Sequence, residues 1–196
     1  AVFGPTDYRA TGPVSDKWLI VFDKEPCAYY LNERDNINDF SSTIETRLMQ
    51  LALVYNIEKL KAEEGRIGAE TDYVKYAERA VLEMENAAAF KHWSVNAFLC
   101  TAEIASGFAF AYDWLYDYLT LPENADALAM VRDGVYKHAI VPFLYNYIVE
   151  KTGTNFVETL SNWNCVCNGS AILVGLAFYE PTDTTGKFED EIGTEY

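Results

Sequence analysis

Basic residues are scarce in this chain. It has 15 Lys and Arg against 30 Asp and Glu, which gives a formal net charge of −15 over 196 residues. A field of that sign repels nucleic acids and anionic membranes, so we expect neither as a partner. A polyanionic ligand would have to be bound by a local concentration of cations or by uncharged amide donors.

Cysteines and histidines are also few. Four cysteines do not make the dense framework of a disulfide-rich protein, so they do not decide the compartment. Cys165 and Cys167 are too close together for the usual zinc spacing, and no histidine lies near them, so we expect no metal. The chain also lacks a glycine-rich phosphate loop and a G-x-S-x-G elbow, and we expect no other cofactor.

Long apolar runs are absent too, so the sequence predicts no membrane-spanning segment. The chain starts at Ala1 without the charged and apolar regions of a signal peptide, so we expect that any such peptide has either been removed or was never included in this sequence. Half of the residues are nevertheless hydrophobic and 15% are aromatic, which is enough for a substantial core.

Glycine and proline divide residues 1–40, which we expect to form an irregular N-terminal arm. Within it, residues 18–22 (WLIVF) could be a short buried strand or an extended segment packed on the helices. From there on the pattern is helical. Capping boxes at Ser42 and Thr120 each predict a helix start, and Pro142 predicts a break. The expected helices cover residues 42–65, a stretch from about 72, 94–119, 120–149 with that break, and 169–179.

Amphipathic helices thus alternate with more uniformly apolar ones. The stretch 104–111 (IASGFAFA) is apolar on every face and predicts a buried helix. Such alternation is typical of stacked αα-hairpins, and an ordinary helical bundle fits the periodicity equally well.

The segment 161–170 (SNWNCVCNGS) is the strongest candidate for chemistry. Asn162 and Asn164 offer uncharged N–H donors just before an apolar helix, where the helix dipole also favours an anion. Together they could cradle a carboxylate and stabilise the charge that builds on it during proton abstraction. The alternative is that these asparagines cap the helix and that Trp163 packs as a staple.

Two further clusters carry polar and aromatic side chains. At the entry to the buried helix, Trp93 could stack on a sugar, and His92 or Asn96 could bind its hydroxyls, although a solvated histidine is the plainer interpretation. His138 lies among apolar residues and is expected to be packed. Asp113 and Asp117 lie one helical turn apart, so they could form an acid/base pair or two exposed positions.

Two of these stretches, taken in order, resemble a known family. Residues 93–119 (WSVNAFLCTAEIASGFAFAYDWLYDYL) resemble the helix of heparinase II/III-like lyases that carries a TAE…A…YDWLYD pattern. Residues 162–169 (NWNCVCNG) are similar to the family's N-W-N-x-V-C-x-G segment, and 72–84 (DYVKYAERAVLEM) resemble the preceding helix. The resemblance covers roughly residues 71–179.

The resemblance implies an α/α toroid followed by a β-sandwich domain, and β-elimination on a uronic-acid polysaccharide such as a glycosaminoglycan or alginate. It implies a secreted or periplasmic protein. Asn162 and Asn164 would neutralise the sugar carboxylate, with Trp163 as a groove wall. Asn96, Glu103 and Tyr112 match positions near the groove or supporting it.

Two features depart from the family. The catalytic tyrosine and histidine that the family carries in later elements have no match here, and Ala97 stands where the family often has a histidine. We therefore expect an all-α, incomplete α/α toroid of stacked helical hairpins over residues 41–196: a lyase fragment that is inactive alone. The alternatives are a glycoside hydrolase on the same architecture and a non-catalytic carbohydrate-binding helical domain.

Overall fold

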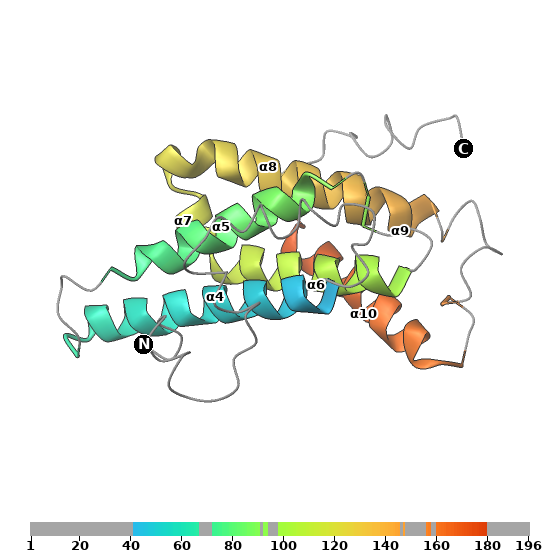
Figure 1. Ribbon diagram of the computed structural model, residues 1–196, viewed down its shortest axis with the longest axis horizontal. Coiled ribbons are helices and arrows are strands. Elements are labelled where there is room, and N and C mark those ends of the chain that lie inside the picture. The colour runs from blue at the N-terminus through green and yellow to red at the C-terminus, as the bar shows by residue number, and fades with distance from the viewer. Residues whose placement is uncertain are drawn as a thin grey trace.

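The computed structural model describes residues 41–66, 72–90, 92–93, 98–145, 147, 156–157 and 160–179 (Figure 1). Every regular element among them is helical, which confirms the all-α class for this part of the chain. The predicted arm at 1–40, including residues 18–22, lies outside the described residues, as does 180–196.

Seven α-helices account for most of the described chain. They are α4 (Ser41–Glu63), α5 (Val74–Ala88), α6 (Phe98–Trp114), α7 (Tyr116–Leu119), α8 (Ala125–Val135), α9 (Val141–Tyr145) and α10 (Asn162–Ala177). A 3₁₀ turn, η2 (Pro122–Asn124), precedes α8, and a π-helical turn, η3 (Tyr136–Ile140), joins α8 to α9.

The long helices lie in two layers. Helix α6 packs between α4 and α10, while α5 packs on α4 and on α8. Figure 1 shows α4, α6 and α10 running in one direction and α5 and α8 running in the opposite direction. The chain therefore alternates between an inner layer (α4, α6, α10) and an outer layer (α5, α8).

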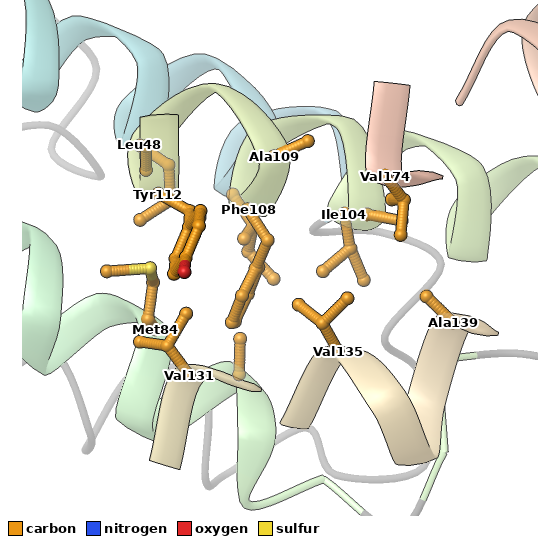
Figure 2. Packing of buried hydrophobic residues seen from close by; sticks show 14 of the residues in the cluster. Leu48, Met84, Ile104, Phe108, Ala109, Tyr112, Val131, Val135, Ala139 and Val174 are labelled. Atoms are coloured by element: carbon orange, nitrogen blue, oxygen red, sulfur yellow. The ribbon is translucent and has the colours of Figure 1, made fainter. Parts of the chain in front are cut away.

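Helix α6 is the centre of the core, as its apolar sequence predicts. Its residues are buried from Phe98 to Tyr112 with few exceptions. Figure 2 shows Ile104 and Phe108 pointing from α6 toward Val131 and Val135 of α8, so the two layers share one apolar interior. Because α6 has neighbours on several sides, it needs apolar residues on several faces.

Two glycines let helices approach closely. A Cβ added to Gly107 would lie 2.7 Å from the Cα of Glu45, and one added to Gly134 would lie 2.9 Å from the Cβ of Ala88. The first contact joins α6 to α4 within the inner layer, and the second joins α8 to α5 within the outer layer. Glycine at these positions therefore sets the spacing in both layers.

The predicted end of the first helix is confirmed. Gly65 has φ 68°, its N–H donates to the carbonyl of Ala62 at 3.0 Å, and the N–H of Arg66 donates to the carbonyl of Lys61 at 2.8 Å. This left-handed C-terminal turn suits glycine, which has no Cβ to clash. The predicted apolar face of the helix is buried throughout: Ile44, Leu48, Leu51 and Tyr55.

Both capping boxes were wrong. Helix α4 already includes Ser41, so Ser42 is not its N-cap. The hydroxyl of Thr120 donates to the carbonyl of Tyr116 at 2.8 Å, so it satisfies the end of α7 rather than the start of the next helix. The predicted helix 94–119 is also interrupted, because Leu115 leaves helical geometry and separates α6 from α7.

The predicted break before Pro142 was wrong as well. Residues 125–145 stay helical, because η3 supplies a π-helical turn immediately before α9. Proline lacks an N–H and its ring clashes with the carbonyl four residues earlier. A π turn shifts the hydrogen-bonding pattern to the fifth residue, which makes room for the ring.

The last helix begins earlier than predicted. Helix α10 starts at Asn162 rather than at 169, so the asparagine-rich segment forms its first two turns. Asparagine has a low helix propensity, but packing against α6 outweighs it.

Candidate functional site

The two family-like segments lie against each other. Helix α6 contains the TAE segment and α10 contains the NWNCVCNG segment, and these two helices pack together in the inner layer. The hydroxyl of Ser170 donates to the carbonyl of Ala102 at 2.7 Å and ties the middle of α10 to the N-terminal half of α6. Residues 68 positions apart in the chain therefore meet at one place.

Asn164 lies half-buried in the first turn of α10. Its amide nitrogen donates to the carbonyls of Phe156 and Val157, each at 2.9 Å. Both N–H bonds are thus directed to the backbone, and the side chain fastens the segment before α10. Its role in neutralising a sugar carboxylate remains a prediction, and it requires a ligand to replace these bonds.

Asn162 and Trp163 are exposed in the same turn. The N-cap of α10 is Ser161, and no side chain caps it by a hydrogen bond, so neither asparagine acts as a helix cap. Trp163 is 37% exposed and is not a staple. These two side chains are accessible to a ligand. His92 is also exposed, and Asn96 lies outside the described residues.

Trp93 is not available to a sugar, so its predicted binding role was wrong. Its ring is 0% exposed, its indole N–H donates to the carbonyl of Ala87 at 2.8 Å, and it stacks on His138 with centroids 5.3 Å apart. The prediction that His138 is packed is confirmed. Burial lowers the pKa of this histidine, while its hydrogen bond to the carbonyl of Ala88 raises it.

Tyr112 is buried too, so it does not contact a ligand directly. Its ring stacks on Phe178 with centroids 4.1 Å apart, and its hydroxyl accepts a hydrogen bond from Arg132 at 2.9 Å. Only the supporting role is compatible with this position. It joins the C-terminal part of α6 to the end of α10 and to α8.

Glu103 belongs to a polar cluster that the sequence did not reveal. Its carboxylate accepts a hydrogen bond from the hydroxyl of Ser41. Burial, and next the nearby charge of Glu103, raise the pKa of Glu45 to about 7. Burial also raises the pKa of Cys167 to about 11, with Cys100 and then Glu103 adding to it. We name Ser41, Glu45 and Glu103 the α4–α6 carboxyl cluster.

One sequence signal could have revealed this cluster. Ser41 and Glu45 are one turn apart on α4, and Glu103 and Gly107 are one turn apart on α6. A glycine inside an apolar helix lets a facing helix approach closely, and a carboxyl at such a crossing is desolvated.

Replacing Glu45 with glutamine should flatten the pH dependence of stability. A folded-state pKa of about 7 against an ordinary 4.5 means that the folded chain holds the proton more tightly. The stabilisation from this proton is complete below pH 4.5 and is lost as the pH rises through 7. With allowance for solvent around a half-buried group, we expect Glu45→Gln to be about 1–2 kcal/mol more stable than wild type at pH 8.

Urea denaturation at pH 5 and pH 8 measures this difference. The control is Glu85→Gln on the exposed side of α5, which should leave the difference between the two pH values unchanged. Identical pH profiles for Glu45→Gln and wild type would contradict the assignment.

The other two candidate carboxylates lie at the surface. Asp113 and Asp117 are both exposed, on α6 and α7 respectively, and Asp117 lies 3.4 Å from the ammonium of Lys59. Within the described part of the chain, no group of three or more His, Cys, Asp and Glu could hold a metal ion. Cys165 and Cys167 are free thiols, the first exposed and the second buried.

Comparison with protein-family models and with curated proteins finds no match for this chain. Among the described helices, none combines the length and the apolar character needed to cross a membrane.

Proposed function

We propose that this chain is part of a polysaccharide lyase that cleaves uronic-acid-containing glycans by β-elimination. The observation that carries the proposal is the packing of α6 against α10, because these helices hold the two segments that resemble lyase motifs. Segments of one active site should be neighbours, and the hydrogen bond from Ser170 to Ala102 is consistent with that.

The two-layer arrangement supports the same proposal. Parallel inner helices covered by antiparallel outer ones are what a stack of αα-hairpins requires. On this proposal, residues 41–196 are an incomplete α/α toroid, completed by further hairpins and a β-sandwich domain in a longer, secreted or periplasmic enzyme. A uronic-acid polysaccharide is its substrate.

The chemistry follows from the substrate. A base removes the proton next to the uronate carboxylate, the C–H electrons form a C4–C5 double bond, and the bond to the C4 oxygen breaks as that oxygen gains a proton. Negative charge builds on the carboxylate, and preorganised N–H donors stabilise it. Asn162 and Asn164 would supply these donors, while the base and acid come from outside this chain.

Asn162 is the better placed of the two for first contact. Its side chain is exposed in the first turn of α10, where the partial positive charge of the helix also acts on an anion. The exposed ring of Trp163 next to it would flank the sugar. Asn164 would join only after a ligand replaces its bonds to the carbonyls of Phe156 and Val157.

Binding by the chain itself tests the anion site. Isothermal titration calorimetry with a uronate oligosaccharide should show binding that Asn162→Ala weakens by about tenfold, because one hydrogen bond to a charged group is lost. A neutral oligosaccharide of the same length should bind equally weakly to both. Equal affinity of wild type and Asn162→Ala for the uronate would contradict the site.

Asn124→Ala is the matched control for Asn164→Ala. The side chain of Asn124 also donates to a backbone carbonyl, that of Tyr118 at 2.7 Å. Both variants should lose stability, but only Asn164→Ala should also lose uronate binding. In the longer enzyme, ultraviolet absorbance from new double bonds would report elimination, and binding without turnover would favour a carbohydrate-binding domain.

A glycoside hydrolase is the second candidate, and the α4–α6 carboxyl cluster favours it. Glu45 and Glu103 come from different helices and differ in environment, as an acid and base pair requires. Products with new reducing ends but no new absorbance, lost in Glu103→Gln, would identify hydrolysis. Full activity in that variant would exclude it.

A further inference from the structure

Asn168 is a third amide in the asparagine-rich segment of α10. It lies one helical turn after Asn164, so the two side chains share a face of the helix. Its side-chain oxygen accepts a hydrogen bond from the hydroxyl of Tyr147. Among the residues that the structure describes, no group accepts a hydrogen bond from its amide nitrogen. Asn168 therefore keeps both N–H donors available, whereas Asn164 directs its own donors to backbone carbonyls.

Tyr147 holds this amide in one orientation. The tyrosine ring packs edge-on against Phe156, with centroids 5.9 Å apart, and Phe156 stacks on Phe98 of α6, with centroids 4.7 Å apart. Both phenylalanines are buried, so the hydroxyl of Tyr147 is tied to the core. Because the amide oxygen of Asn168 is bound on one side, its nitrogen is presented on the other. A donor that is oriented before binding loses less conformational entropy when a ligand binds.

The position of Asn168 along α10 bears on the acceptor that it can bind. The partial positive charge of a helix N-terminus favours anions, but it acts only within the first turn. Asn162 lies in that turn, while Asn168 lies six residues further on, about 9 Å along the helix axis. An anion bound at Asn168 would therefore gain little from the helix dipole, in contrast to an anion bound at Asn162.

The surrounding charge also disfavours an anion at Asn168. Burial raises the pKa of Cys167, the preceding residue, and the nearby charges of Cys100 and Glu103 add to that shift. Helices α6 and α10 contain no lysine or arginine that could offset the carboxylate of Glu103. The uncharged donors of Asn168 thus suit an uncharged acceptor, such as a hydroxyl or an acetamido carbonyl, better than a carboxylate.

We propose that Asn168 is a sugar-binding residue and that Tyr147 is its positioning residue. The N–H donors of Asn168 bind an uncharged oxygen of the glycan, either a hydroxyl or an acetamido carbonyl, at a place separate from the uronate at Asn162. The inference rests on the proposed function for the class of ligand, because it assigns to α10 a second contact with the same polysaccharide. The chain then recognises more of the glycan than its carboxylate.

Nuclear magnetic resonance of the nitrogen-15-labelled chain tests the contact with two uncharged probes. Cellotetraose offers hydroxyl oxygens without acetamido groups, and chitotetraose offers acetamido carbonyls as well. We expect the side-chain amide signals of Asn168 to shift with a dissociation constant on the order of 1 mM, as befits a few hydrogen bonds. Tighter binding of chitotetraose would identify the acetamido carbonyl as the acceptor, and equal binding of the two probes would identify a hydroxyl.

Asn168→Asp should weaken the binding of either probe by at least about tenfold. The new carboxylate still accepts the hydrogen bond from Tyr147, but it replaces both donors with an acceptor. Tyr147→Phe should weaken binding by about threefold and move the Asn168 side-chain signals even without a ligand, while the backbone signals of α10 stay in place. Asn124→Asp is the matched control, because it places the same charge at a half-buried asparagine of η2. It should bind the probes like wild type.

Two results would overturn the proposal. One is the absence of any shift of the Asn168 side-chain signals up to about 20 mM of either probe, and the other is undiminished binding in Asn168→Asp. Neither result involves a uronate. A wild type that binds a uronate oligosaccharide no more tightly than cellotetraose, while Asn168 is still required for cellotetraose, would remove the lyase proposal and leave this contact in place.

Discussion

Glu83→Gln is expected to lower the free energy of unfolding by about 3–5 kcal/mol. Glu83 is 1% exposed, and its carboxylate joins α4 to α5 through a salt bridge with Arg47, whose side chain is also buried. The same oxygen accepts a hydrogen bond from Arg79 at 3.0 Å. Glutamine keeps the shape but leaves two guanidinium groups facing a neutral amide, so a buried positive charge loses its compensation.

Urea denaturation followed by circular dichroism measures this loss. Glu78→Gln, exposed on the same helix, is the control and should stay within about 0.5 kcal/mol of wild type. Replacing both partners with apolar residues, Arg47→Met with Glu83→Leu, should recover much of the loss, because no buried charge of the pair remains. A single-variant loss below about 1 kcal/mol would mean that water reaches this pair.

Trp93→Ala is the second large effect, with an expected loss of about 4 kcal/mol. The enclosed ring contacts Phe108 of α6, with centroids 4.7 Å apart, and His138. Its removal opens a cavity between the layers and also ends the hydrogen bond to the carbonyl of Ala87. Trp93→Phe fills part of the space and should lose about half as much.

Trp163→Ala provides a tryptophan control at an exposed position. Truncating it should change the free energy of unfolding by less than about 1 kcal/mol, while its effect on uronate binding tests the groove-wall role. Equal losses from the two alanine variants would contradict the burial of Trp93. Chemical denaturation gives both values.

The pair of tryptophans shows what the sequence can and cannot predict. Hydrophobic periodicity predicted α4, α5 and the buried α6, because the spacing of apolar residues indicates which face of a helix is buried. Trp93 and Trp163 both lie beside polar residues in the sequence, and both were predicted to contact a sugar ring. Only the packing of α6 and η3 around Trp93 separates this core residue from the exposed Trp163.

Helix ends were harder to predict than helix faces. Gly65 was correctly placed, because its left-handed conformation is a property of one residue. The predictions at Thr120 and Pro142 were wrong. The first depends on which carbonyl the Thr120 hydroxyl can reach, and the second depends on a π-helical turn that the residues before Pro142 form. The partners of Asn164 likewise come from a segment that no local pattern connects to it.

The candidate site shows the same difference between local features, which the sequence predicts, and contacts between distant residues, which it does not. The asparagine segment was found from composition, whereas the α4–α6 carboxyl cluster depends on residues 62 positions apart that meet only where Gly107 admits the backbone of α4. The sequence alone shows which chemical groups are present. The crossing of the helices decides which of these groups become neighbours that are shielded from water.

The alternation of the layers has a kinetic consequence. Each inner helix finds its inner neighbour only after the chain has passed through the outer layer, so the contacts Ser41–Glu103 and Ser170–Ala102 span 62 and 68 residues. Closing such loops costs chain entropy before any packing is gained. Folding should therefore be slower than for a helical bundle of the same length whose successive helices are all direct neighbours, since high contact order slows folding.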